Sequence, residues 1–120
     1  MSMRTNQTRE LDAGTFEDEV LRADGPLLVD FSADWCPPCR MMDPVVDQLA
    51  TTLAGHLSVG RLDVDRHPEV GARFGVLSMP TLILFAGGRP VDRLVGFSSP
   101  GEVRRWVAGT MRAAGAGVQQ

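Results

Sequence analysis

The stretch Asp34-Trp35-Cys36-Pro37-Pro38-Cys39-Arg40 contains the only two cysteines of the 120-residue chain. They are three positions apart, after the apolar run at residues 27–31 and before a helical pattern. A Cys-x-x-Cys on a strand-to-helix turn can close a small disulfide and open it again. This arrangement suits thiol–disulfide exchange, and we interpret the rest of the chain as its support.

Length and composition indicate one ordinary globular domain, with 43% apolar and 22% charged residues. The net charge is −3 and the arginines are scattered, so no basic stripe indicates a nucleic-acid ligand. No apolar stretch reaches the roughly 18 residues of a membrane helix, and the first ten residues lack the apolar segment of a secretory signal. We therefore expect a cytoplasmic protein. In that compartment a lone cysteine pair is more often catalytic or metal-binding than structural.

Hydrophobic periodicity predicts the order helix, strand, helix, strand, helix, hairpin, helix. The first helix should begin at Thr15 with a capping box to Asp18 and run for about ten residues. Pro44 should kink the helix that follows the cysteines. Strand–helix–strand connections imply parallel pairing and the hairpin makes the sheet mixed, so the fold class is an α/β layer sandwich. The other expected elements are strands at 27–32, 57–64, 81–85 and 91–95 and helices at 39–54, 67–75 and from 99 to about 111.

The expected domain organisation is one domain between two short tails. Residues 1–10 are polar and aperiodic, and residues 115–120 continue a Gly/Ala-rich end. The domain itself is expected at residues 11–114. No internal repeat interrupts it.

Several motifs across nearly the whole chain carry a family resemblance: Val29-Asp30-Phe31, Trp35-Cys36-x-x-Cys39, Pro44, Met79-Pro80-Thr81 and Gly96. In their order and spacing the chain resembles thioredoxins from about residue 15 to 111, although Pro37 replaces the glycine of the family's usual Trp-Cys-Gly-Pro-Cys. The resemblance implies a thioredoxin fold, with a central mixed sheet of four or five strands flanked by about four helices. The family's outer first strand would fall at residues 7–11, which are poorly apolar, so the sequence leaves that strand in question.

Cys36 is the expected nucleophile, because a helix N-terminus stabilises a thiolate, and Cys39 one turn inward is the expected resolving thiol. A zinc site is one alternative, but zinc needs four ligands, and the spacing of His56 and His67 does not fit a zinc motif. A static structural disulfide is another. A loop this short gains little stability from cross-linking, which argues against it.

Pro37 and Pro38 are expected to tune the cysteines. A second proline stiffens the turn and removes the N–H of residue 37, which would weaken thiolate stabilisation near Cys36. Stiffening would favour whichever redox state already fits the turn. The sequence therefore does not decide whether Pro37 raises or lowers the reduction potential.

Asp30 is the one charged residue in an otherwise apolar strand. The resemblance implies that it lies beneath the disulfide, where burial would raise its pKa and let it exchange a proton with Cys39. Base rates alone would favour a solvated carboxylate at a strand end. Arg61 falls where the family often has a lysine, so it would tune Asp30 without itself titrating; a solvated surface charge is the alternative.

The resemblance also implies a substrate groove beside the disulfide. A cis Pro80 would place the Met79 backbone against the disulfide for strand-like pairing with a substrate segment. Trp35 would offer a flat apolar contact, and Arg40 is the basic residue that usually follows the resolving cysteine. The expected groove residues are Trp35, Ser78, Met79, Pro80, Val95 and Gly96.

These features predict a protein-disulfide reductase that serves cell redox homeostasis and electron transport through Cys36 and Cys39, without a bound metal or cofactor. The resemblance implies that NADPH recharges it through a flavoprotein, thioredoxin reductase. Disulfide-containing proteins would be the substrates, and a monomer is the default state. Two alternatives stay open: an oxidant or isomerase with a raised reduction potential, and a thioredoxin-fold binding module that turns over no disulfide.

Overall fold

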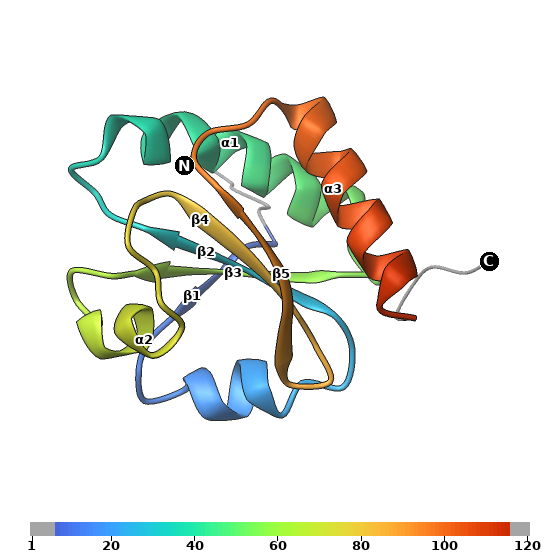
Figure 1. The fold of residues 1–120 in the computed structure, drawn as a ribbon, viewed down its shortest axis with the longest axis horizontal. Helices are drawn as coiled ribbons and strands as arrows, with labels where there is room; N and C mark the ends of the chain where they lie inside the picture. Colours follow the sequence, from blue (N-terminus) through green and yellow to red (C-terminus); the bar gives the residue numbers. More distant parts are fainter. Residues whose placement is uncertain (1–6, 116–120) are drawn as a thin grey trace, which may run out of the picture.

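The computed structural model describes residues 7–115, which form a five-stranded sheet between two layers of helices (Figure 1). The strand order is β1-β3-β2-β4-β5, with β1 and β2 parallel to β3 and with β4 antiparallel to both β2 and β5. The expected mixed α/β sheet is thus confirmed, in its five-stranded form. The strands are β1 (Arg9–Leu11), β2 (Leu27–Ser32), β3 (Ser58–Asp63), β4 (Thr81–Ala86) and β5 (Arg89–Val95). The helices are η1 (Glu17–Leu21), α1 (Pro37–Thr52), α2 (Pro68–Arg73) and α3 (Pro100–Ala113).

The two faces of the sheet carry separate apolar layers. Helices α1 and α3 cover one face, and α2 and η1 cover the other (Figure 1). Phenylalanines dominate the second layer. The rings of Phe16 and Phe74 both make edge-on contacts with the ring of Phe85, with centroid distances of 5.9 and 5.3 Å. The sheet is therefore buried on both sides, which explains the continuous apolar character of its central strands.

Side-chain alternation along β2 decides which layer each residue enters. Leu28 belongs to the α1/α3 layer, whereas Leu27, Val29 and Phe31 belong to the α2 layer. Asp30 is two residues after Leu28 and so faces α1. In the parallel pairing with β3 its direct neighbour is Arg61. The backbone register alone thus places this carboxylate beside a guanidinium.

The outer strand that the sequence left in question exists, as β1. Only Leu11 of this strand is buried. Its side chain fills the space over Gly60 of β3, where a Cβ atom would lie 2.5 Å from Leu11 Cδ1. The packing of β1 on the sheet thus depends on the contact between the Leu11 side chain and Gly60. The expected tail at residues 1–10 therefore ends earlier, because Arg9 and Glu10 pair with β3; residues 1–6 and 116–120, where the rest of the expected tails fall, lie outside the described residues.

The first predicted helix is shorter than expected. It is a five-residue π-helical turn, and its N-cap position, Phe16, has no side-chain cap. The predicted capping box at Thr15 is wrong: the amide and the hydroxyl of Thr15 both donate to the Asp12 carboxylate, at 2.9 and 3.2 Å, in the turn before the helix. Phe16 and Val20 are buried, whereas Leu21 is only partly buried.

The last helix, α3, begins with a complete capping box. Ser99 and Glu102 form a reciprocal capping box: the Ser99 side chain accepts from the Glu102 amide, and the Glu102 carboxylate accepts from the Ser99 amide. The buried face of α3 consists of Val103, Val107 and Met111. Trp106 is only half-buried, and its indole N–H donates to Asp92 of β5 at 3.1 Å.

Candidate active site

A disulfide between Cys36 and Cys39 lies where α1 begins, with the two Cα atoms 5.2 Å apart. Cys36 is the N-cap of the helix and has an extended backbone. The Cys39 amide, at the third helical position, donates a hydrogen bond to Cys36 Sγ at 3.3 Å. Sulfur therefore takes the place that a serine or aspartate oxygen has at an ordinary helix N-cap.

Pro37 and Pro38 occupy the first two positions of α1. Amides at these positions have no acceptor within the helix, so the prolines remove no helical hydrogen bond, and their restricted backbone suits a helix start. They also supply no N–H to Cys36. Pro44, further along, lies inside a helix that continues to Thr52.

The loops before β4 and after β5 meet at this disulfide. The Met79–Pro80 peptide is cis, and the Met79 carbonyl oxygen is 3.7 Å from Cys36 Sγ. The Gly96 amide donates to the Pro80 carbonyl at 2.8 Å, and Val95 is the strand neighbour of Thr81. Three segments that are distant in the sequence thus converge on one edge of the molecule.

Both sulfur residues are nearly closed to solvent, with Cys36 4% and Cys39 1% exposed. Ala33 packs with them, and Val64 and Met79 pack against this group. Trp35 is not part of that packing. This residue is 65% exposed, and its indole N–H donates to the Asp65 carboxylate.

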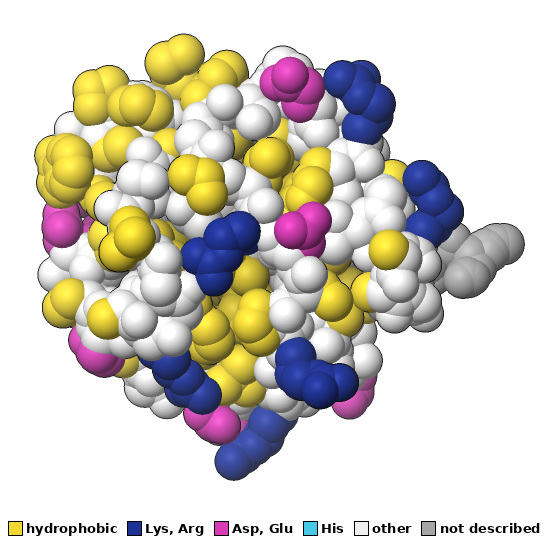
Figure 2. Space-filling view, viewed as in Figure 1, with side chains coloured by type: hydrophobic (Ala, Val, Ile, Leu, Met, Phe, Trp, Pro, Cys, Tyr) yellow, Lys and Arg dark blue, Asp and Glu magenta, His cyan; other side chains and the backbone are white. Residues whose placement is uncertain are grey.

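Apolar side chains gather on the surface around the disulfide. Figure 2 shows hydrophobic side chains clustered at the upper left of the view, over the end of the molecule at which α1 begins (Figure 1). The sequence analysis missed Leu77 and Phe97, which are adjacent in the chain to the expected groove residues Ser78 and Gly96. Their apolar character beside these loop residues was the available signal. The exposed apolar residues of the two loops and of the α1 start are Trp35, Met41, Leu77, Val95 and Phe97, of which Leu77 is 94% exposed.

Two other expected site residues are exposed and make local contacts. Arg40 donates to the Asp34 carbonyl at 3.2 Å. The Ser78 carbonyl accepts a hydrogen bond from the Thr81 hydroxyl at 2.7 Å, which fastens the loop before β4. Neither contact reaches the disulfide.

Asp30 is buried between the sheet and α1, so the solvated alternative is wrong. Its side chain is 1% exposed, and Arg61 Nε donates to Asp30 Oδ2 at 3.3 Å. The Arg61 side chain is only 17% exposed, which excludes the surface-charge alternative for that residue. Desolvation raises the pKa of Asp30 from 3.8 to about 7, against the opposing charge of Arg61.

Two further carboxylates that the sequence analysis missed reach the same guanidinium. Asp43 Oδ1 lies 3.3 Å from Arg61 Nε, and Asp47 Oδ1 lies 3.3 Å from Arg61 Nη2. Helical spacing was the available signal, since Asp43 and Asp47 follow Cys39 by four and eight positions on α1.

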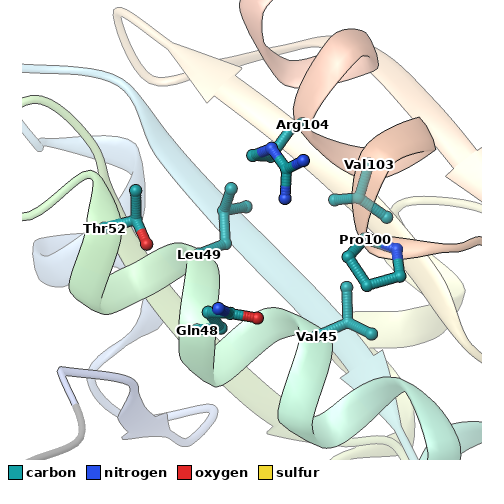
Figure 3. Close-up of a pocket in the computed structure, with 7 residues that line it drawn as sticks. All are labelled: Val45, Gln48, Leu49, Thr52, Pro100, Val103 and Arg104. Atoms are coloured by element: carbon teal, nitrogen blue, oxygen red, sulfur yellow. The ribbon is translucent and has the colours of Figure 1, made fainter.

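The hollow between α1 and α3 is too small to be a ligand site. It is lined by side chains from both helices that point toward one another (Figure 3), and its volume is about 10 Å³. That is about the space of one water molecule. A larger surface hollow of about 220 Å³ lies beside Arg61, with Ser32 and Arg66 in its wall.

Comparison with known proteins identifies this arrangement. The thioredoxin family model matches residues 7–109. The chain belongs to the thioredoxin family. Among its relatives, a thioredoxin of Alicyclobacillus acidocaldarius is 44% identical over 94 residues, which cover 78% of this chain and 90% of that protein. Thioredoxin 1 of a Nostoc species is 49% identical over 82 residues, covering 68% of this chain and 77% of that protein.

A third relative joins two activities in one polypeptide. The bifunctional thioredoxin reductase/thioredoxin of Mycobacterium leprae is 47% identical over 89 residues, which cover 74% of this chain and 19% of that protein. Family membership and the Cys36–Cys39 disulfide together establish a thioredoxin-type disulfide oxidoreductase that works by dithiol–disulfide exchange. None of the helices in residues 7–115 is long and apolar enough to cross a membrane.

Proposed function

We propose that this protein is a cytoplasmic protein-disulfide reductase. It would work as a monomer and receive electrons from NADPH through a flavoprotein thioredoxin reductase. The observation that carries the reducing direction is the sparse set of donors at Cys36 Sγ: the Cys39 amide donates, whereas Pro37 and Pro38 have no N–H. A strong oxidant owes its high potential to a stabilised reduced form. A thiolate with few donors therefore favours a reductant.

The proposed reaction begins at Cys36. Its thiolate attacks one sulfur of a substrate disulfide, the substrate S–S bond breaks, and a mixed disulfide and one substrate thiolate result. Cys39 then attacks Cys36 Sγ, which breaks the mixed disulfide and releases the second substrate thiolate. Two electrons pass to the substrate, and the Cys36–Cys39 disulfide remains.

Asp30 is the proposed base for the second step. Cys39 must lose its proton to attack, and a buried carboxylate with a pKa of about 7 is matched to a thiol at neutral pH. The proton would pass to Asp30, and from there to solvent. Arg61, which stays charged throughout, would keep the carboxylate ionisable inside the protein.

The proposed substrate groove consists of Trp35, Ser78, Met79, Pro80, Val95 and Gly96. Support comes from the position of the Met79 carbonyl beside Cys36 Sγ and from the exposed apolar residues around it. Backbone pairing with shallow apolar contacts would accept many partners. The M. leprae protein, which joins a thioredoxin to a thioredoxin reductase, supports a reductase as the electron donor.

The deciding experiment measures the reduction potential of the Cys36–Cys39 pair in dithiothreitol buffers, with thiol alkylation as the readout. We expect a value near that of thioredoxin, about −270 mV. A value above about −200 mV, near the isomerases, would overturn the reductase proposal. In an insulin-reduction assay, Cys36→Ser should lower the rate to the uncatalysed level, and Cys39→Ser should accumulate the mixed disulfide. Unchanged biological activity of both variants in the cell, in spite of lost insulin reduction, would instead favour a binding module.

A further inference from the structure

One guanidinium faces three carboxylates between the sheet and α1. Arg61 Nε is 3.3 Å from both Asp30 Oδ2 and Asp43 Oδ1, and Arg61 Nη2 is 3.3 Å from Asp47 Oδ1. If all three acids were ionised, the group would carry two uncompensated negative charges. A partly buried group of this kind favours retention of a proton.

The elements around Asp30 contribute few other charges. On β3 its neighbour is Arg61, and on β4 its neighbour is the apolar Leu82. Helix α1 contributes Asp43 and Asp47, together with Cys39 one turn before Asp43. Asp34 and Arg40, near the start of α1, act on Asp43 in opposite directions. Asp43 is thus the carboxylate that competes most directly with Asp30.

Asp30 and Asp43 compete for a single hydrogen-bond donor. Arg61 Nε carries one hydrogen, and it donates to Asp30 Oδ2. Asp43 Oδ1 is equally close, yet it is buried and accepts no hydrogen bond from any residue between 7 and 115. A buried acceptor without a donor is unfavourable. Asp43 can therefore accept this hydrogen bond when the hydrogen bond between Arg61 and Asp30 weakens.

We propose that Asp43 is a positioning residue for Asp30, and that the Arg61 Nε–H moves from Asp30 to Asp43 when Asp30 is protonated. This inference rests on the proposed role of Asp30. When Cys39 gives its proton to Asp30, the neutral carboxyl no longer holds the guanidinium, and Asp43 receives the Nε–H bond. When the proton leaves toward solvent, the bond returns to Asp30. Asp43 itself gains and loses no proton.

The electrostatics of the group agree with this exchange. Burial is the main cause of the raised pKa of Asp30, and the negative charge of Asp43 raises it further while Arg61 opposes both. Burial also raises the pKa of Asp43. A surface hollow of about 220 Å³ lies beside Arg61, so solvent reaches the side of the group on which this residue lies.

The test is the titration of Asp30 in the oxidised protein, followed by ¹³C NMR of its carboxyl carbon and assigned with Asp30→Asn. Asp43→Asn keeps the shape and an acceptor oxygen but removes the charge. We expect the Asp30 midpoint to fall by about one pH unit, because a like charge in contact range is lost. Asp43→Ala, which also removes the alternative acceptor, should lower it at least as far.

Asp47→Asn is the matched control, because it removes an equal charge from the same helix but faces the other guanidinium nitrogen. Its effect on the Asp30 midpoint should be less than half that of Asp43→Asn. An unchanged midpoint in both Asp43 variants, or equal shifts for Asp43→Asn and Asp47→Asn, would overturn the proposal. Since the oxidised protein needs no substrate for this titration, failure to reduce disulfides would contradict the proposed function alone.

Discussion

At the scale of the residue, the buried carboxyl of Asp30 destabilises the folded protein at neutral pH. Its carboxyl has a pKa of about 7 in the folded protein and 3.8 as the ordinary value. Between these values the folded state binds more protons than the unfolded state, so stability falls as pH rises. A buried acid that destabilises the fold at neutral pH is better explained by a chemical role than by a structural one.

Asp30→Asn should therefore stabilise the oxidised protein above pH 7. The gain should reach at most about 4 kcal/mol at pH 8 and fall below about 1 kcal/mol near pH 4, where the folded carboxyl is protonated and the unfolded carboxyl is about half protonated. Urea unfolding at the two pH values measures it. Asp24→Asn, a change at an exposed loop residue, serves as the control. A gain of equal size at both pH values would contradict the assigned protonation.

At the scale of the element, the start of α1 controls the cysteines through its missing donors. A side chain at an N-cap position accepts hydrogen bonds from the second and third helical amides. Here the third is the Cys39 amide and the second is Pro38, which has none. The unusual residue of the motif is Pro37, but its position is the less suited of the two for donation to Cys36. This geometry separates the effects of the two prolines.

Pro38→Ala should raise the reduction potential by about 30 mV, because one added N–H···S⁻ bond of about 1.4 kcal/mol stabilises the reduced form. Pro37→Ala, the matched variant, should change the potential by less than half as much. Equilibration with dithiothreitol measures both. A larger change from Pro37→Ala would show that stiffness of the turn, and not the lost donor, sets the potential.

The elements also show where sequence patterns suffice and where they fail. The buried strands and the capped helices follow from local periodicity, so β2, α1 and α3 were predicted nearly to their ends. Strand β1 depends on Leu11 meeting Gly60, a contact across 49 positions that no local pattern contains. The proximity of Asp30 and Arg61 likewise requires the β2–β3 register. Asp43 could have been found from its helical spacing to Cys39, but its shared donor could not.

At the scale of the whole molecule, the sheet joins two cores that do not otherwise meet. Strand β2 contributes Leu28 to the α1/α3 layer and its odd-numbered neighbours to the α2 layer. Losing either layer would expose one face of this central strand. The two layers should therefore unfold together, as expected for a single domain of this size.

Two matched substitutions test this coupling, since Val46 in the α1/α3 layer and Val20 in the α2 layer are both fully buried. Each change to Ala should cost about 2 kcal/mol, the transfer of two methyl groups plus a small cavity. In a Trp35→Phe background the remaining tryptophan is Trp106, which packs against the α1/α3 layer. Its fluorescence should report the Val20→Ala destabilisation from the opposite face of the sheet, at the same urea midpoint as circular dichroism. A Trp106 transition that stays at the wild-type midpoint while circular dichroism shifts would mean that the layers unfold separately.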